Sequence, residues 1–139
     1  MISNFSECFL SEQEFYLDKI FYNRIEKNET TQEYLLNCID NLETTVKEEK
    51  VNLTVRRTVR FEPKEIFELT VSFGVVLKIK KEKLEEYDWS TINLAEEFQA
   101  NGNFVLDNIM SRITMLIADI TSSYGQNPII VPPVIAQKR

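Results

Sequence analysis

The sequence contains no histidine and only three glycines among its 139 residues. Histidine is the side chain best suited to proton transfer near neutral pH, so its absence removes the commonest general acid or base. A phosphate-binding loop needs closely spaced glycines, and the usual nucleotide-binding, zinc-protease and hydrolase motifs are missing. Nothing in the chain therefore indicates an enzyme or a cofactor, and carboxylate pairs such as Glu48–Glu49 lie in charged stretches typical of a solvated surface.

Cysteine is equally scarce. Cys8 and Cys38 do not have the spacing of a metal or redox site, so we expect two free, buried thiols in a reducing cytoplasm and no bound metal. The N-terminus lacks the basic region and apolar run of a signal peptide. No stretch approaches the ~18 consecutive apolar residues of a membrane span. The sequence thus predicts a cytoplasmic protein without membrane insertion.

A basic surface is also lacking. The net charge is −6, and the only basic cluster is "VRRTVR" at 55–60, so a nucleic-acid partner is disfavoured. The hydrophobic share of 43% and the charged share of 27% are ordinary for a folded protein. A chain of this length is long enough to bury a core, and we expect a single domain over 1–139.

The clearest positive signal is alternation in the middle of the chain. Apolar residues occupy almost every odd position of 51–61 and 66–80, with Arg57 as the single break. Such a period predicts two strands with one buried face each, joined by a hairpin turn at 62–65. A register that places Val55 opposite Phe73 keeps both apolar sets on one side, and it also places Phe61 opposite Phe67. Gly74 inside the second strand predicts a bulge, a bend or a close approach.

A long amphipathic helix follows. Apolar residues recur at steps of three and four from Leu106 to Tyr124, with Asn103 as the expected cap and Gly125 as the expected end. A shorter helix over 91–100, capped by Ser90, connects it to the sheet. The opposite face of the long helix carries small residues around one methionine and is either a packing contact with another subunit or plain solvent surface: Ser111, Met115, Ala118 and Ser122.

The first 50 residues fit two structures. "SEQE" at 11–14 has the pattern of a helix capping box, and apolar spacing over 12–25 suits a helix. The same stretch also alternates as a strand would, and 34–46 is equally ambiguous. Periodicity alone leaves both alternatives open.

The end of the chain is unusually apolar and rich in proline. "GQNPIIVPPVI" (125–135) combines Gly125, Pro128 and Pro132–Pro133 with the apolar run 129–131. Together with "FELTVSFGVVLKI" (67–79) and "FYLDKIFYNRIE" (15–26), this order resembles the SecB family of protein-export chaperones, especially its diverged SecB-like branch. The Phe-Pro-Tyr that the family often carries near the start of its long helix is replaced here by "DNIMSRI", and the ending after the prolines also differs.

The resemblance implies an α+β fold in which a four-stranded antiparallel sheet packs against the long C-terminal helix. It favours strands at 15–26 and 34–46, with a helix over 12–25 as the alternative. Members of this family pair into dimers and stack into tetramers, which suits the small-residue face at Ser111, Met115, Ala118 and Ser122. We therefore expect a homo-oligomer, dimer or tetramer.

The resemblance also implies a function, namely an ATP-independent holding chaperone for unfolded or partly folded polypeptides. Its clients are either exported proteins passed to the SecA motor or one dedicated partner such as an antitoxin. A scaffold with one fixed folded partner is the alternative, and an enzyme or small-ligand binder is a third possibility. A large apolar residue lies more often in the core of a protein than in an exposed groove, and this holds for each candidate taken singly. The candidates for the client-binding groove are Phe15, Tyr16, Ile20, Tyr22, Trp89, Phe98, Ile129, Ile130, Val131, Val134 and Ile135.

Overall fold

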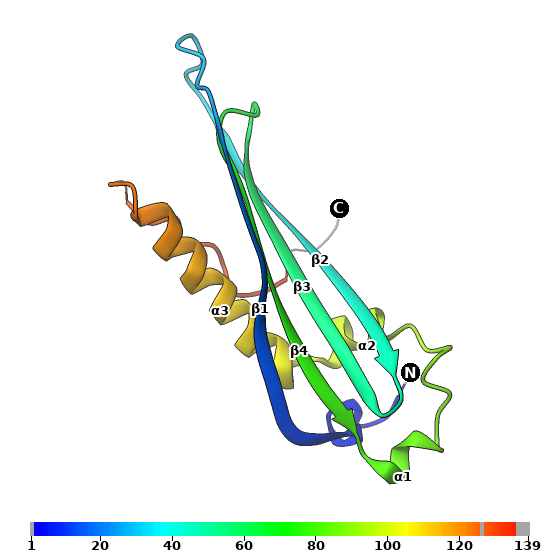
Figure 1. The fold of residues 1–139 in the computed structure, drawn as a ribbon. Helices are drawn as coiled ribbons and strands as arrows, with labels where there is room; N and C mark the ends of the chain where they lie inside the picture. Colours follow the sequence, from blue (N-terminus) through cyan, green and yellow to red (C-terminus); the bar gives the residue numbers. More distant parts are fainter. Residues whose placement is uncertain (1, 126, 136–139) are drawn as a thin grey trace.

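The computed structural model contains one antiparallel sheet of four long strands and a long C-terminal helix (Figure 1). It describes residues 2–125 and 127–135. The strands are β1 (Phe9–Ile25), β2 (Leu35–Lys47), β3 (Lys50–Glu62) and β4 (Ile66–Ile79). The helices are η1 (Phe5–Cys8), α1 (Lys81–Leu84), α2 (Leu94–Asn101) and α3 (Asn103–Ser122). This architecture confirms the α+β fold class that the sequence predicts.

The predicted hairpin forms the centre of the sheet, whose order is β1-β4-β3-β2. Val55 pairs with Phe73 as expected, and the ring centroids of Phe61 and Phe67 lie 5.2 Å apart. Because successive strand residues point to opposite faces, alternate residues of β3 are buried on the side of α3. We call this side the inner face and the other the outer face.

The two strands expected in the first 50 residues are confirmed as β1 and β2, and the alternative helix over 12–25 is wrong. β1 pairs with β4 almost along its whole length, which satisfies the backbone groups on the side of β4. The residues that look like a capping box lie where the register of this pair shifts, between Phe9 and Gln13. A bulge there accommodates polar residues outside the regular ladder.

The connection from β1 to β2, residues 26–34, crosses the end of the sheet because these strands occupy opposite edges (Figure 1). Glu65 in the β3–β4 turn is buried and holds this connection. Its carboxylate accepts hydrogen bonds from the backbone N–H of Asn28 and from the hydroxyl of Thr31, the latter at 3.1 Å. The crossing loop is thus tied to the central hairpin.

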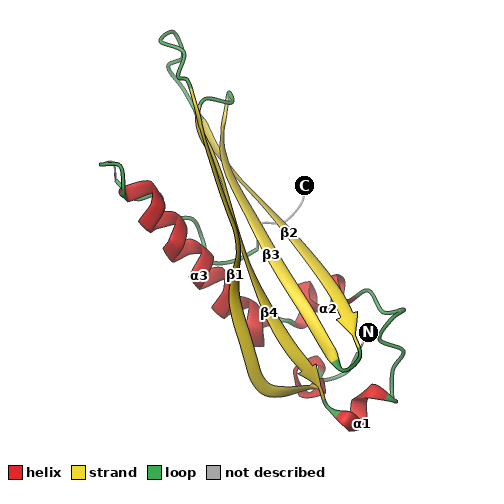
Figure 2. Cartoon of the chain, viewed as in Figure 1, coloured by secondary structure: helices red, strands yellow, loops and turns green. Residues whose placement is uncertain are grey.

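α3 lies obliquely across the inner face (Figure 2) and buries most of the predicted apolar stripe, from Leu106 to Ile117. No helix in the described part of the chain is long and apolar enough to cross a membrane. Gly125 follows α3 with a φ of 88°, in the left-handed conformation that the sequence predicts.

The predicted helix caps are wrong. Gly102, not Asn103, precedes the first residue of α3, and a Cβ on this glycine would lie 2.2 Å from the carbonyl oxygen of Phe98. Asn93, not Ser90, caps α2, because its side chain accepts from the N–H of Glu96 at 3.2 Å. Both errors shift a boundary by a few residues and leave the helices in place.

Gly74 permits a close approach, one of the three outcomes expected for it. The ring of Tyr16 from β1 lies over Gly74, and a Cβ at Gly74 would lie 2.1 Å from Tyr16 Cζ. The Tyr16 hydroxyl continues to β3 and donates a hydrogen bond to Asn52 Oδ1 at 2.6 Å. One side chain therefore joins three strands across the outer face.

We predict that Gly74→Ala is destabilising only when Tyr16 is present. In the wild-type background the new methyl group displaces the ring and its hydrogen bond, whereas in a Tyr16→Ser background it lowers the entropy of the unfolded chain and is neutral or stabilising. Urea denaturation of the four proteins should give a coupling free energy of about 1 kcal/mol or more. Equal effects of Gly74→Ala in both backgrounds would contradict this interpretation.

Candidate functional site

Large apolar side chains are exposed along the edge strand β1. Leu17, Ile20 and Tyr22 pair with inward residues of β4, two of them buried and one half-buried, and therefore belong to the inner face. All three side chains are nevertheless 40–50% exposed. Phe15 is half-buried, and the guanidinium of Arg112 from α3 lies 4.5 Å from the centre of its ring. We call Leu17, Ile20 and Tyr22 the β1 strip.

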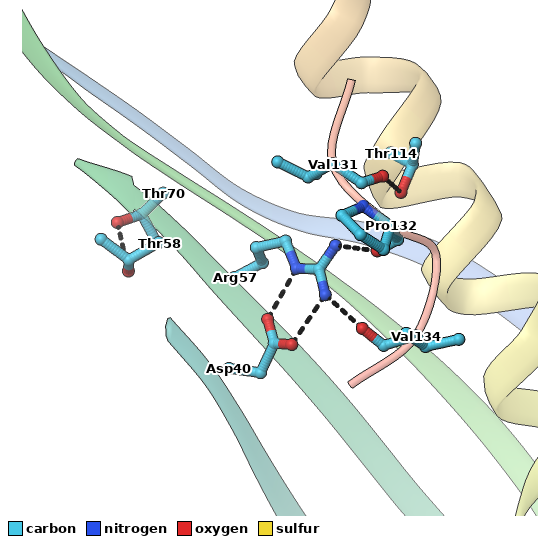
Figure 3. A network of polar contacts seen from close by, with 8 residues as sticks. All are labelled: Asp40, Arg57, Thr58, Thr70, Thr114, Val131, Pro132 and Val134. Atoms are coloured by element: carbon cyan, nitrogen blue, oxygen red, sulfur yellow. Dashed lines mark hydrogen bonds and ion pairs between the residues drawn. The ribbon is translucent and has the colours of Figure 1, made fainter. Parts of the chain in front are cut away.

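The chain after α3 returns along the inner face. In this tail, residues 127–135, the N–H of Ile129 donates to Thr121 Oγ1 at 2.8 Å, and the carbonyl of Val131 accepts from the hydroxyl of Thr114 at 3.2 Å. Since the tail advances as the helix numbering falls, it runs antiparallel to α3. Figure 3 shows the tail between α3 and the central strands.

The tail ends against a buried ion pair, Arg57 of β3 and Asp40 of β2 (Figure 3). Arg57 Nε and Nη2 each donate to one carboxylate oxygen of Asp40 at 2.7 Å. Nη1 donates to the carbonyl of Pro132 and Nη2 to that of Val134, both at 2.5 Å. The guanidinium, which is 1% exposed, thus binds β2 and the tail at the same time.

The ion pair keeps Arg57 charged despite its burial. Burial lowers the pKa of Arg57, but the hydrogen bonds and the charge of Asp40 raise it by more, so that it lies above its ordinary value. A charged guanidinium is the stronger donor to a carbonyl oxygen. The carbonyls of Pro132 and Val134 therefore receive charge-assisted hydrogen bonds.

The tail is held by its backbone and turns two apolar side chains outward. Val131 is buried in the core, whereas Ile130 is 74% exposed and Val134 is 61% exposed. We call Ile130 and Val134 the tail strip. Beside Val134, a cavity of about 180 Å³ separates the tail from the start of α3, with Leu106 and Met110 in its lining.

Several residues expected in an exposed groove belong to the core instead. Trp89 and Phe98 are buried, and each ring contacts Phe9, with centroids 5.8 and 5.9 Å apart. The segment 81–101 and the start of the chain cover Trp89 and Phe98, and Val131 of the tail is likewise buried, so these three side chains are not exposed in this chain. Tyr16 lies on the outer face, away from the β1 strip, while Ile129 and Ile135 are half-buried.

The residues expected at an oligomer interface lie on the outward side of α3. Ser111, Met115 and Ser122 are exposed and Ala118 is half-buried. Met115 exposes 67% of its surface to solvent. These positions are open to contact, and their role in assembly stays a prediction.

Both cysteines are free, as expected. Cys8 is buried and Cys38 is half-buried. Burial raises the pKa of each thiol above its ordinary value, which disfavours the reactive thiolate. Within the described residues, no group of three or more histidine, cysteine or acidic side chains is placed to hold a metal ion.

Sequence reasoning did not find the ion pair, although a signal for it was present. On the inner face of β3, Arg57 lies between the buried Val55 and Val59, and on that of β2, Asp40 lies between two half-buried apolar residues. Two opposite charges, each in an apolar phase of adjacent strands, predict a buried pair once the register is known. The register of β2 against β3 was the missing information.

We predict that Arg57→Met alone lowers the free energy of unfolding by about 3–5 kcal/mol, because it removes the positive charge that balances the buried carboxylate of Asp40. The double variant Asp40→Leu/Arg57→Met should recover most of this loss, since an apolar pair of similar volume often replaces a buried ion pair without net cost. Chemical denaturation of the three proteins measures both differences. A double variant as unstable as the single one would contradict the assignment of the ion pair.

No protein-family model matches the sequence, and no curated protein matches it. Among solved structures, the chain is similar to Rv1957 of Mycobacterium tuberculosis, a SecB-like chaperone in complex with a ChAD peptide from the HigA1 antitoxin. The match has a TM-score of 0.69 and 12% sequence identity, and it covers 94% of this chain and 93% of the other.

A second structure, a protein of unknown function from Streptococcus agalactiae, matches with a TM-score of 0.42 and 9% identity over 89% of this chain and 98% of the other. This weaker likeness carries no weight. The agreement with the first structure extends over the sheet and the helices together. The chain therefore has the SecB-like fold.

Proposed function

We propose that the protein is an ATP-independent holding chaperone that binds unfolded or partly folded polypeptides and performs no bond chemistry. The observation that carries this proposal is the outward display of Ile130 and Val134 on a tail fixed by its own backbone. The β1 strip adds a second exposed apolar surface on the same inner face. Exposed apolar surface of this kind typically marks a site for another chain.

Such a surface suits clients of many sequences. Burying apolar area contributes roughly 25 cal/mol per Å² whatever the order of the side chains, so binding is broad and weakens in the cold. Apolar burial needs neither a nucleotide nor a catalytic group.

We propose that the client is one dedicated partner, such as an antitoxin segment, rather than exported proteins in general. The SecB-like structure that this fold matches contains an antitoxin peptide, which supports a peptide client for this chain as well. Delivery to SecA would require an acidic docking surface, whereas the outer face of the sheet mixes both signs of charge: Glu14, Glu43 and Glu68 with Lys19, Arg56 and Arg60.

We further propose that the protein acts in the cytoplasm as a dimer or tetramer. An uncovered edge strand with apolar side chains invites pairing, and a second copy would protect it. The outward face of α3 around Met115 offers a second contact between copies. Client grooves would then run along the β1 and tail strips where two subunits meet.

A scaffold with one fixed folded partner is the alternative. A scaffold would co-purify with that partner and leave denatured proteins to aggregate. A general holdase would suppress the aggregation of several unrelated denatured proteins at near-stoichiometric ratios, and a dedicated chaperone would protect only its own client.

We predict that Ile130→Ser/Val134→Ser abolishes client capture and leaves the fold intact, because both side chains point to solvent. The matched control is Leu35→Ser/Ile39→Ser, which removes two exposed apolar side chains from the outer face of β2. Light scattering of an aggregating client measures capture, and the denaturation midpoint reports the fold. Full capture by the tail variant would assign these residues no part in binding.

We also predict that the purified protein is larger than a monomer in size-exclusion chromatography with light scattering. Met115→Glu should lower its mass, because a carboxylate on the outward face of α3 cannot be buried between copies without a large desolvation cost. Ser3→Glu, at an exposed position near the N-terminus, is the control for the added charge. A wild-type protein that is monomeric at all concentrations would rule out the proposed assembly.

A further inference from the structure

We propose that the protein has a second binding site, for an acidic polypeptide segment that ends in apolar residues. The site lies at the end of the sheet where the β2–β3 turn and α1 are found (Figure 1). It combines a row of lysines on the outer face with a hollow beside that row. The tail lies on the inner face, so this site is separate from the proposed client surface and does not depend on the holding function.

The lysine row consists of Lys47, Lys50 and Lys78. Lys50 of β3 lies directly opposite Lys47 of β2 on one side and Lys78 of β4 on the other. All three alternate with inward residues, so their side chains belong to the outer face. Because adjacent strands are about 4.8 Å apart, the three cationic side chains start at this spacing along one line across the sheet.

The lysine row is unfavourable for folding by itself, since like charges directly opposite each other destabilise a pair of strands. Within residues 2–125 and 127–135, no carboxylate forms an ion pair or hydrogen bond with any of the three lysines. The segments 47–50 and 78–83 together hold six lysines and three glutamates, a net charge of +3 in a chain whose net charge is −6. A bound anionic partner would supply the missing negative charge.

A hollow of about 600 Å³ adjoins the lysine row at Lys78. Such a volume is in the range of roughly 300–1,000 Å³ typical of sites that enclose a bound group. Leu10 is available to it because the register of β1 against β4 shifts between Phe9 and Gln13, and this leucine stays 44% exposed. The wall is mostly apolar, since the lysines contribute their aliphatic stems; it consists of Leu10, Ile79, Leu84, Lys78, Lys80 and Lys81 with Glu49 and Glu82 among them.

Two backbone hydrogen bonds hold the walls of the hollow in place. The N–H of Ile79 donates to the carbonyl of Glu49 in the β2–β3 turn, and the N–H of Lys80 donates to the carbonyl of Cys8, both at 2.8 Å. The end of β4 is thereby tied to the segments on either side of it. The hollow is therefore formed before any partner binds.

The lysine row and the hollow together select the class of partner. Three cations in line call for several anionic groups at close spacing, whereas a fatty acid offers a single carboxylate. A nucleic acid offers many charges but places no aliphatic group in the hollow. An extended polypeptide carries a side chain every ~3.3 Å. It can place successive carboxylates along the lysine row and an apolar side chain in the hollow.

The test measures the binding of fluorescein-labelled peptides to the full chain by fluorescence anisotropy. The first peptide is a run of aspartates followed by leucines, the second ends in serines instead of leucines, and the third has asparagines instead of aspartates. We expect the first peptide to bind about tenfold more tightly than either of the others, and its affinity to fall as salt is added. Equal affinities for the first and third peptides would contradict the proposal.

Two sets of variants assign the binding to these residues. Lys50→Gln/Lys78→Gln should weaken binding of the first peptide about tenfold. The denaturation midpoint should stay unchanged or rise, because the substitutions relieve the repulsion within the lysine row. The matched control, Lys19→Gln/Lys64→Gln, removes the same charge from exposed positions elsewhere and should bind as the wild type does.

Leu10→Ser should weaken binding of the leucine-ended peptide and leave that of the serine-ended peptide unchanged. Leu35→Ser, at a leucine that is 64% exposed at the other end of the sheet, is the control for the hollow.

The outcomes separate this site from other surfaces. Binding of the first peptide that is equal in the Lys50/Lys78 variant and in the Lys19/Lys64 control would refute the site. Phosphatidylglycerol vesicles that bind the wild type but not the Lys50/Lys78 variant, with no binding of the peptide, would assign the lysine row to a membrane surface and overturn the proposal. A protein that binds the peptide and captures no client would refute the holding function alone.

Discussion

The buried contact between Arg57 and Asp40 organises the inner face of this molecule. It joins the edge strand β2 to the central strand β3 and fixes the tail above both. A buried ion pair contributes little net stability, because desolvation offsets most of the attraction. Its directional hydrogen bonds instead select one position for the tail, since any shift along the strand would leave a buried donor unsatisfied.

The need for such a tail follows from the dimensions of the fold. Four strands spaced about 4.8 Å apart are wider than one helix of about 10 Å diameter. α3 packs mainly against β4, so the inner faces of β3 and β2 require another cover. α2 contacts β2 and the tail adds Val131, while at the opposite edge Leu17, Ile20 and Tyr22 of β1 stay partly exposed. The exposed apolar side chains are therefore a consequence of covering a wide sheet with one helix.

The same geometry explains which elements could be predicted from the sequence. β3 and β4 lie in the centre with one buried face, so their alternation is clear and even the pairing of Val55 with Phe73 followed from it. β1 has exposed residues on both faces, so its apolar and polar residues alternate less regularly and its sequence also fits a helix. The burial of Trp89 and Phe98 did not follow from the sequence, because Trp89 lies in an irregular segment without a period and the short helix α2 that carries Phe98 does not reveal its partner. Packing around Phe9 buries both rings.

The prolines of the tail oppose aggregation, which its exposed apolar side chains would otherwise favour. An extended apolar segment beside a sheet would normally be a template for further strands, which leads to aggregation. Pro132 and Pro133 have no N–H and cannot donate to a neighbouring strand, and the carbonyls of Pro132 and Val134 are already bound by Arg57. The segment can therefore offer apolar side chains to a client while these backbone groups are unavailable for strand addition.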